Sequence, residues 1–100
     1  MLTWKKIAKK SKSEVVVTPI TIPSSAKEIF ISVFYSSNYM FTFFVLNNED
    51  ITSNRTLRSG TPTNDAYIVL TYANGSLKVT NGGVRINGTE ENPYISVYYR

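Results

Sequence analysis

Cysteine and histidine are both absent from this 100-residue sequence. Without cysteine there is no disulfide, no thiolate nucleophile and no thiolate metal ligand. Without histidine the chain lacks the commonest general base and metal ligand, and with it the Ser-His-Asp and Cys-His arrangements of hydrolases. The carboxylate pairs Glu49-Asp50 and Glu90-Glu91 are adjacent in polar segments, whereas a glycosidase holds two carboxylates apart across a cleft. We therefore expect no enzymatic activity, no catalytic residues, no metal site and no cofactor.

Strong helix formers are also scarce. Ala and Leu together supply 9 residues, whereas Val, Ile, Thr and the aromatic residues supply 42. β-branched and aromatic side chains fit the pleated surface of a sheet and lose rotamer freedom in a helix. A chain of this length makes one domain. The composition therefore predicts a single all-β domain over residues 1–100.

Long apolar runs are missing as well. No segment approaches the roughly 18 consecutive apolar residues of a membrane-spanning helix. The N-terminal lysines are not followed by the apolar stretch of a secretory signal. We therefore expect neither membrane insertion nor a signal peptide.

The net charge of +4 comes from one short segment. Five lysines lie within Lys5–Lys12, and the rest of the chain has six basic and seven acidic residues. A nucleic-acid-binding surface needs basic groups along a groove or face, ideally beside exposed aromatic side chains. We therefore expect no nucleic-acid partner, and keep a nucleic-acid or membrane-surface binder acting through Lys5–Lys12 as a lesser alternative.

The segment Glu28–Leu46 has the pattern of a hairpin joined by a turn at Ser36-Ser37-Asn38. Side chains alternate between the two faces of a strand. In the first run, one face carries Ile29, Ile31, Val33 and Tyr35, and the other face carries Phe30 and Phe34. In the second run, one face carries Tyr39, Phe41, Phe43 and Val45, and the other face carries Met40, Phe44 and Leu46. Both faces are therefore apolar, and part of their cover is expected to come from another subunit.

The N-terminal part predicts two extended segments. Residues 2–8 are expected to form a first strand, joined by a polar loop at Lys9–Ser13 to a second run at Val15–Ile22. Pro19 and Pro23 punctuate that second run, and proline removes a ladder donor, so residues 15–22 suit an edge strand or an extended crossing segment. Residues 1–13 would then be a basic N-terminal strand and loop.

Beyond the hairpin, turn signals dominate. Asn47–Asn64 is rich in Asn, Ser, Thr and charge and predicts a long irregular loop, which is either functional or contains a short unrecognised element. Asparagine-glycine pairs at 74–75 and 87–88 predict two-residue turns with positive φ, and Asn81-Gly82-Gly83 predicts another. Asp65–Ala73 and Tyr94–Tyr99 alternate as strands. This spacing predicts an antiparallel β-sandwich or jelly-roll-like fold of about seven to nine short strands.

Two arginines and two tyrosines are the candidate binding residues. Arg55 and Arg58 lie in the predicted loop, where planar guanidinium groups suit carboxylate or phosphate groups of a surface polymer. The alternative is that both pair with Glu49-Asp50 or with a neighbouring subunit. Tyr39 and Tyr72 lie next to turns and combine an apolar ring with a polar tip. Their alternative role is to cover the edge of the core.

The order of several short motifs resembles one known family. Trp4 opens the first strand, Thr18–Pro23 is extended, and Lys27-Glu28 leads into the aliphatic run of the hairpin. Arg58-Ser59-Gly60 follows in the long segment, and the chain ends with Val97–Arg100 (VYYR). These features resemble the small C-terminal tip domains of tail-fibre and related structural proteins of phages and prophages of gut bacteria.

The resemblance implies a non-enzymatic virion module that forms homo-oligomers, with a trimer favoured. Its expected partner is a bacterial cell-surface glycan or protein, and its expected location is the tail or another surface structure of the virion. The alternative is a host-encoded carbohydrate-binding module, which would be a monomeric sandwich that uses Tyr and Asn side chains.

Overall fold

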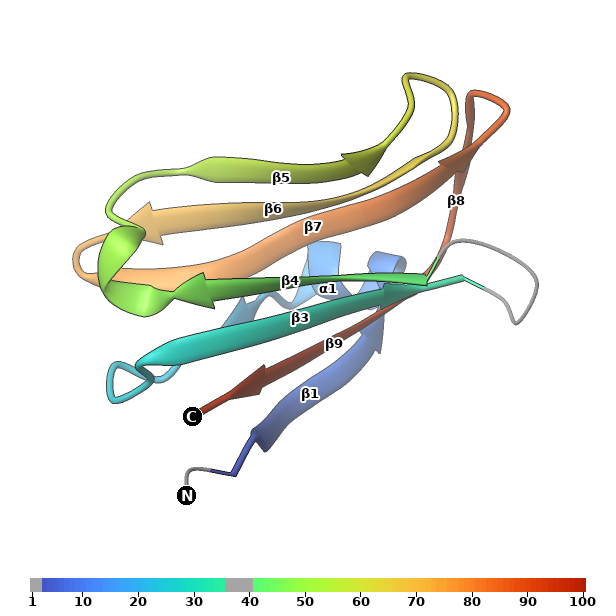
Figure 1. Ribbon diagram of the computed structural model, residues 1–100. Coiled ribbons are helices and arrows are strands. Elements are labelled where there is room, and N and C mark those ends of the chain that lie inside the picture. The colour runs from blue at the N-terminus through green and yellow to red at the C-terminus, as the bar shows by residue number, and fades with distance from the viewer. Residues whose placement is uncertain (1–2, 36–40) are drawn as a thin grey trace.

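A computed structural model describes residues 3–35 and 41–100, which form two β-sheets packed face to face (Figure 1). The elements are β1 (Lys5–Ser11), α1 (Lys12–Val17), β2 (Ile20–Thr21), β3 (Glu28–Phe34), β4 (Phe41–Asn47), the 3-10 helix η1 (Asn48–Asp50), β5 (Arg55–Gly60), β6 (Asp65–Ala73), β7 (Ser76–Ile86), β8 (Thr89–Glu91) and β9 (Tyr94–Tyr99). Sheet A has the strand order β1-β9-β3-β4, and sheet B has the order β2-β7-β6-β5 with β8 paired to β7. All pairings in the described residues are antiparallel. The predicted all-β antiparallel sandwich is confirmed.

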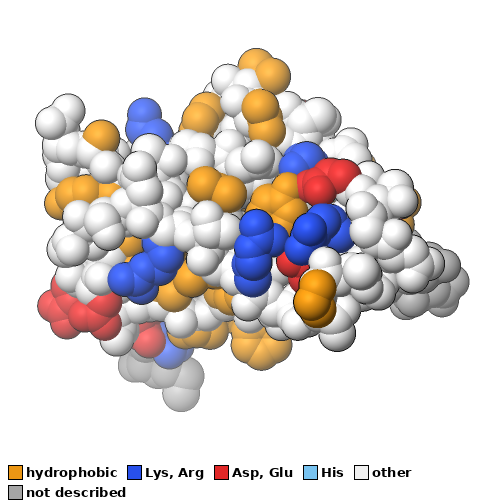
Figure 2. Space-filling view, turned by 90° about the horizontal axis from the view of Figure 1, so that it is seen from above, with side chains coloured by type: hydrophobic (Ala, Val, Ile, Leu, Met, Phe, Trp, Pro, Cys, Tyr) orange, Lys and Arg blue, Asp and Glu red, His pale blue; other side chains and the backbone are white. Residues whose placement is uncertain are grey.

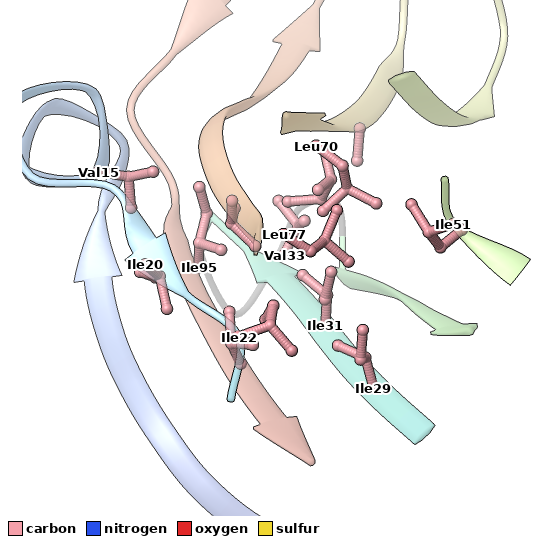
Figure 3. Close-up of a cluster of buried hydrophobic side chains, with 14 of the residues drawn as sticks. Val15, Ile20, Ile22, Ile29, Ile31, Val33, Ile51, Leu70, Leu77 and Ile95 are labelled. Carbon is pink, nitrogen blue, oxygen red and sulfur yellow. The ribbon is translucent and has the colours of Figure 1, made fainter. Parts of the chain in front are cut away.

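The core lies between the two sheets and consists mainly of alternate strand residues (Figure 3). Val15 of α1 and Ile22, Ala26 and Ile51 of the connecting segments complete it. Ile29, Ile31 and Val33 of β3 point inward and are fully buried. Ile68 and Leu70 of β6 join the same buried cluster from sheet B. Full burial of one such side chain contributes about 1.5–3 kcal/mol. A shift of one residue in register would expose the whole set, so the alternation fixes the register.

The hairpin and both asparagine-glycine turns agree with the sequence prediction. Strand β3 pairs with β4 from Glu28 opposite Asn47 onward, while the predicted turn at Ser36-Ser37-Asn38 lies outside the described residues. Asn74 and Asn87 both have φ of 51°, and the glycines that follow them have φ of 75° and 79°. Positive φ at both central positions is what a type I′ turn requires.

The N-terminal segment differs from the prediction. Strand β1 continues to Ser11 and pairs with β9, not with residues 15–22. The helix α1 replaces the end of the expected loop and the start of the expected second strand. The Ser11 side chain accepts a hydrogen bond from the backbone N–H of Glu14, and the Glu14 carboxylate accepts one from the Ser11 N–H. This capping box initiates a helix, so local capping outweighs the β-propensity of the following valines. The two-residue strand β2 is left as one edge of sheet B.

The segment 47–64 is not irregular throughout, because it contains two short elements that its sequence pattern did not identify. Asn47 ends β4, η1 follows, and Arg55–Gly60 forms β5 at the other edge of sheet B. Strand β5 pairs with β6 from Arg55 opposite Leu70 to Gly60 opposite Asp65. Most side chains of β5 are exposed, so the strand shows no apolar alternation and is held by its backbone hydrogen bonds to β6.

The third difference is at Asn81-Gly82-Gly83, which lies inside β7 and not in a turn. The pairing of β7 with β6 steps from Asn81 opposite Val69 to Val79 opposite Leu70, which leaves Thr80 as an extra residue. Such a β-bulge shifts the phase of the strand. Before the bulge the odd-numbered residues Leu77 and Val79 face inward, and after it the even-numbered residues Gly82 and Val84 do so.

Candidate functional site

The outer face of sheet A carries a group of large apolar side chains, which we call the aromatic face. It comprises Trp4, Phe30, Phe43, Val45, Tyr94 and Tyr98. Phe43 is 56% exposed, Val45 52% and Tyr94 48%. Phe30, in the middle strand, is paired across the sheet with Val45 on one side and Tyr98 on the other. The apolar groups therefore form one surface across three strands.

Phe30 is the centre of the aromatic face. Its ring stacks on Phe43 at a centroid distance of 5.3 Å and an interplanar angle of 12°. Trp4 contacts it at 5.7 Å, and Tyr98 meets it edge-on at 5.9 Å and 72°. Offset and edge-to-face pairs of this kind contribute about 0.5–1.5 kcal/mol each beyond the area they bury. The rings are thus held in place before any partner arrives.

Charged groups line the margin of this face. The guanidinium of Arg100 lies 4.2 Å from the centre of the Trp4 ring, and its Nε donates to Glu28 at 2.8 Å. Lys9 Nζ lies 5.2 Å from the centre of the Tyr94 ring. An aromatic centre with a charged margin is the composition of many protein interfaces.

A cleft opens at the end of the sandwich, lined by residues of the β2–β3 connection, η1 and the β6–β7 turn. These three segments lie on the left of Figure 1. We call it the end cleft. Its volume is about 450 Å³. Ile22, Ala26, Ile51 and Leu77 form its apolar floor, and the polar groups at its rim include Lys27, Asn47, Asn48, Glu49, Thr52 and Tyr72. It combines an apolar base with polar groups above it, as small-molecule sites do.

The outer side of sheet B carries a cluster of charges around the ring of Tyr67, whose centre lies 5.0 Å from the Arg58 guanidinium. Figure 2 shows basic and acidic side chains gathered over this sheet. The Asp65 side chain is 4% exposed and accepts hydrogen bonds from Arg85 Nε at 2.6 Å and from Arg58 Nη1 at 3.0 Å. Hydrogen bonding from Arg85 lowers the pKa of the Asp65 carboxyl, burial opposes this, and Arg58 adds to the lowering. The pKa therefore lies below its ordinary value, and the carboxylate is ionised at neutral pH.

Beside this cluster, the Lys12 ammonium ties α1 to sheet B. Its Nζ lies 3.0 Å from the Tyr67 hydroxyl, 3.0 Å from the Gly82 carbonyl and 3.1 Å from the Glu90 carboxylate. The Tyr67 hydroxyl also donates to Glu90. Burial lowers the pKa of Lys12, but hydrogen bonds to Tyr67 and Glu90 outweigh burial and raise it.

Burial and the hydrogen bond to Glu90 likewise raise the pKa of the Tyr67 hydroxyl. Lys12 and Tyr67 therefore both keep their protons at neutral pH. The network joins α1, β6, β7 and β8. Sequence reasoning missed it because its members are 23 to 78 residues apart in the chain.

The four predicted site residues do not come together. Arg55 and Arg58 lie on the edge strand β5 and not on a recognition loop. Arg58 forms an ion pair with Asp65. This partner differs from Glu49 and Asp50, the acidic residues that the sequence analysis considered. Tyr72 lines the end cleft, and Tyr39 lies outside the described residues. The aromatic face was signalled by the two-sided hairpin. Of the residues that line the end cleft, the sequence marked Tyr72 alone, by its place next to a turn.

Comparison of the chain with protein-family models, with curated proteins and with solved structures gives no match. Within residues 3–35 and 41–100, no helix is long and apolar enough to span a bilayer. The same residues contain no group of three or more acidic side chains placed to hold a metal ion. The aromatic face and the end cleft are therefore the candidate interaction sites of the described residues.

Proposed function

We propose that the protein is a non-enzymatic structural module of a phage or prophage virion, of the tail-fibre tip type. In this proposal it assembles through the aromatic face into a homo-oligomer, a trimer being favoured, and contacts a polymer or protein on the bacterial surface. The observation that carries the proposal is the exposure of the aromatic face in the single chain.

Exposed apolar residues are common on soluble proteins when they occur singly, whereas a contiguous group marks an interaction surface. Here Phe43 and Val45, both more than half exposed, are neighbours of the ring cluster around Phe30. Burying these side chains against a partner would remove them from water at roughly 25 cal/mol per Å². Tyrosine, tryptophan and phenylalanine are the residues enriched at interfaces.

The charges at the two edges of sheet A favour a second copy of the chain as the partner. Strand β1 forms one edge and carries Lys5 and Lys6, while β4 forms the other edge and leads into Glu49 and Asp50 of η1. The strand registers place Lys5 in the same row across the sheet as Leu46. The basic and acidic groups therefore lie at the same end of the sheet, on opposite edges.

Copies arranged around an axis, with their aromatic faces turned inward, would bring the basic edge of one chain beside the acidic edge of the next. Contacts between two different surfaces of identical subunits close into rings when the rotation allows. A trimer is the ring we favour, because tail-fibre tips are commonly three-fold. Opposite charges at neighbouring edges would also fix the order of the subunits.

The assignment to a virion is supported by the resemblance of three short motifs to tail-fibre tip domains. Trp4 precedes β1, Lys27-Glu28 leads into β3, and Val97–Arg100 ends β9. In the structure the motifs meet, because Arg100 lies over Trp4, forms an ion pair with Glu28, and accepts backbone hydrogen bonds from Lys27 and Glu28. They therefore act as one structural unit at the end of sheet A. Tail, baseplate or holin genes next to the coding gene would support this assignment, and their absence would count against it.

Light scattering after size-exclusion chromatography tests the assembly. At micromolar concentration the wild-type protein should have about three times the chain mass of 11.3 kDa. Phe43→Glu should be monomeric but still folded, because the side chain is more than half exposed in the single chain. Its melting temperature should be lower than that of the wild type, since the stacking on Phe30 and the stabilisation by association are both lost. Val17→Glu is the matched control, since Val17 is 81% exposed but lies on α1, away from the aromatic face. A monomeric wild-type protein would contradict the proposal and favour the host-encoded carbohydrate-binding module.

A further inference from the structure

We infer that the end cleft is a binding site for a neutral sugar unit. The inference rests on the proposed function only for the source of the sugar, which would be the polysaccharide of a bacterial surface. It places recognition at the end of the sandwich and not at Arg55 and Arg58. The site is separate from the aromatic face, so sugar binding and assembly can be measured independently.

The shape of the end cleft suits one end of a saccharide chain. Its volume of about 450 Å³ lies within the range of small-ligand pockets. Ile22, Ile51 and Leu77 close its floor and are at most 4% exposed, so the base is firmly packed core. A sugar ring offers carbon-bound hydrogens on its faces and hydroxyl groups around its edge. An apolar floor beneath a polar rim matches both parts of that ring.

The polar walls are held in place by the protein's own hydrogen bonds. The Asn48 backbone N–H donates to the Lys27 carbonyl at 2.8 Å, and its side-chain Nδ2 donates to the Ala26 carbonyl at 2.9 Å. These bonds fix η1 against the β2–β3 connection. They also leave the side-chain oxygen of Asn48 as an acceptor in a defined position. A site whose polar groups are already ordered loses little entropy on binding.

Tyr72 supplies a second polar group to the cleft. Its ring packs against the core from the end of β6, and no hydrogen bond to its hydroxyl occurs among the described residues. The hydroxyl can therefore donate to, or accept from, a ligand hydroxyl. Thr52, which is exposed at the same rim, offers another.

The charge of the rim points to a neutral ligand. Lys27 and Glu49 contribute one charge of each sign, and the Glu28 carboxylate is already paired with Arg100 at 2.8 Å. An anionic ligand would need an excess of cations, which these lining residues do not have. Neutral hexoses and N-acetylhexosamines fit this balance, because their hydroxyl and amide groups both donate and accept.

Nuclear magnetic resonance titration of the full chain tests the inference. Glucose, galactose and N-acetylglucosamine are each added to ¹⁵N-labelled Phe43→Glu protein up to about 50 mM, which covers millimolar dissociation constants. At least one sugar should shift the backbone amides of Asn48, Thr52 and Gly75. If none of the three sugars shifts these amides, or if the shifts map to the aromatic face, the inference is wrong. Assembly of the wild-type protein would be unaffected by that failure.

Two variants locate the ligand. Tyr72→Phe should weaken binding of the active sugar about tenfold, the effect of one lost hydrogen bond, while Tyr94→Phe on the aromatic face should not change it. Ser24→Trp should fill the cleft and abolish binding without changing the oligomeric state, because Ser24 is exposed at the rim. Unchanged affinity in both Tyr72→Phe and Ser24→Trp would overturn the assignment of the site.

Discussion

Gly82→Ala tests the close approach between the two sheets at β7. An alanine Cβ at this position would lie 2.7 Å from Ile95 Cδ1 and 2.9 Å from Ile68 Cδ1, well inside ordinary contact. Both isoleucines are fully buried, so the core must shift. Overpacking of this kind costs about 1–3 kcal/mol, and alanine recovers roughly 0.5–1 kcal/mol of the backbone entropy that glycine loses in a strand. We expect a net destabilisation of about 1–2 kcal/mol.

Thermal unfolding of Phe43→Glu protein with and without Gly82→Ala measures this effect without a contribution from association. For a domain of this size, the expected loss lowers the melting temperature by roughly 4–16 °C. Gly75→Ala is not a suitable control, because its φ of 75° strains any other residue. The better control is a double-mutant cycle with Ile95→Val, which removes the Cδ1 atom that the new methyl group would strike.

In the parent protein, Ile95→Val should cost about 0.5–1.5 kcal/mol. In the Gly82→Ala protein, Ile95→Val should lower the free energy of unfolding by less than this, or should raise it, because it removes the Cδ1 atom that the new methyl group would strike. The coupling energy between the two sites should be at least about 0.5 kcal/mol. Unchanged stability in Gly82→Ala, or additive effects of the two substitutions, would refute the packing argument.

The two charge clusters give further predictions. Asp65→Asn should destabilise the protein by about 2 kcal/mol at pH 7, less than the 3–5 kcal/mol of a fully buried pair because both arginines are partly exposed. The folded-state pKa of Asp65 is lowered, so its contribution is present above about pH 4 and is lost as the pH falls through the folded-state pKa. Urea unfolding should therefore show the two proteins converging toward pH 2, and parallel curves would contradict the ion-pair assignment. Lys12→Met should cost about 1–2 kcal/mol at pH 7. The folded-state pKa of Lys12 is raised, so the difference should persist below about pH 10 and shrink as the pH rises through the folded-state value. A constant difference up to pH 11.5 would count against the network.

The sequence by itself determined the elements whose chemistry is local. The β3–β4 hairpin followed from alternation, because a side-chain period of two places Ile29 and Ile31 on one face whatever the strand pairs with. The turns after Ala73 and Ile86 followed from the backbone freedom of asparagine-glycine pairs at positive φ. The capping box at Ser11 and Glu14 was equally local, and the helix could have been predicted from it.

Tertiary structure decided everything that depends on a distant partner. Strand β5 is a strand because β6 supplies its hydrogen bonds, although its exposed side chains carry no apolar pattern. Gly82 and Gly83 lie within a strand because they pair with Ile68 and Tyr67 of β6. Neighbouring atoms occupy the space that a Cβ atom would need at either position, which explains why both residues are glycine. Arg58 contacts Asp65, and Tyr72 lines the end cleft, because of the way the strands of sheet B pair. This pairing cannot be read from the spacing of residues in the sequence. A local pattern reports which way a side chain points, whereas its neighbours are set by long-range strand pairing.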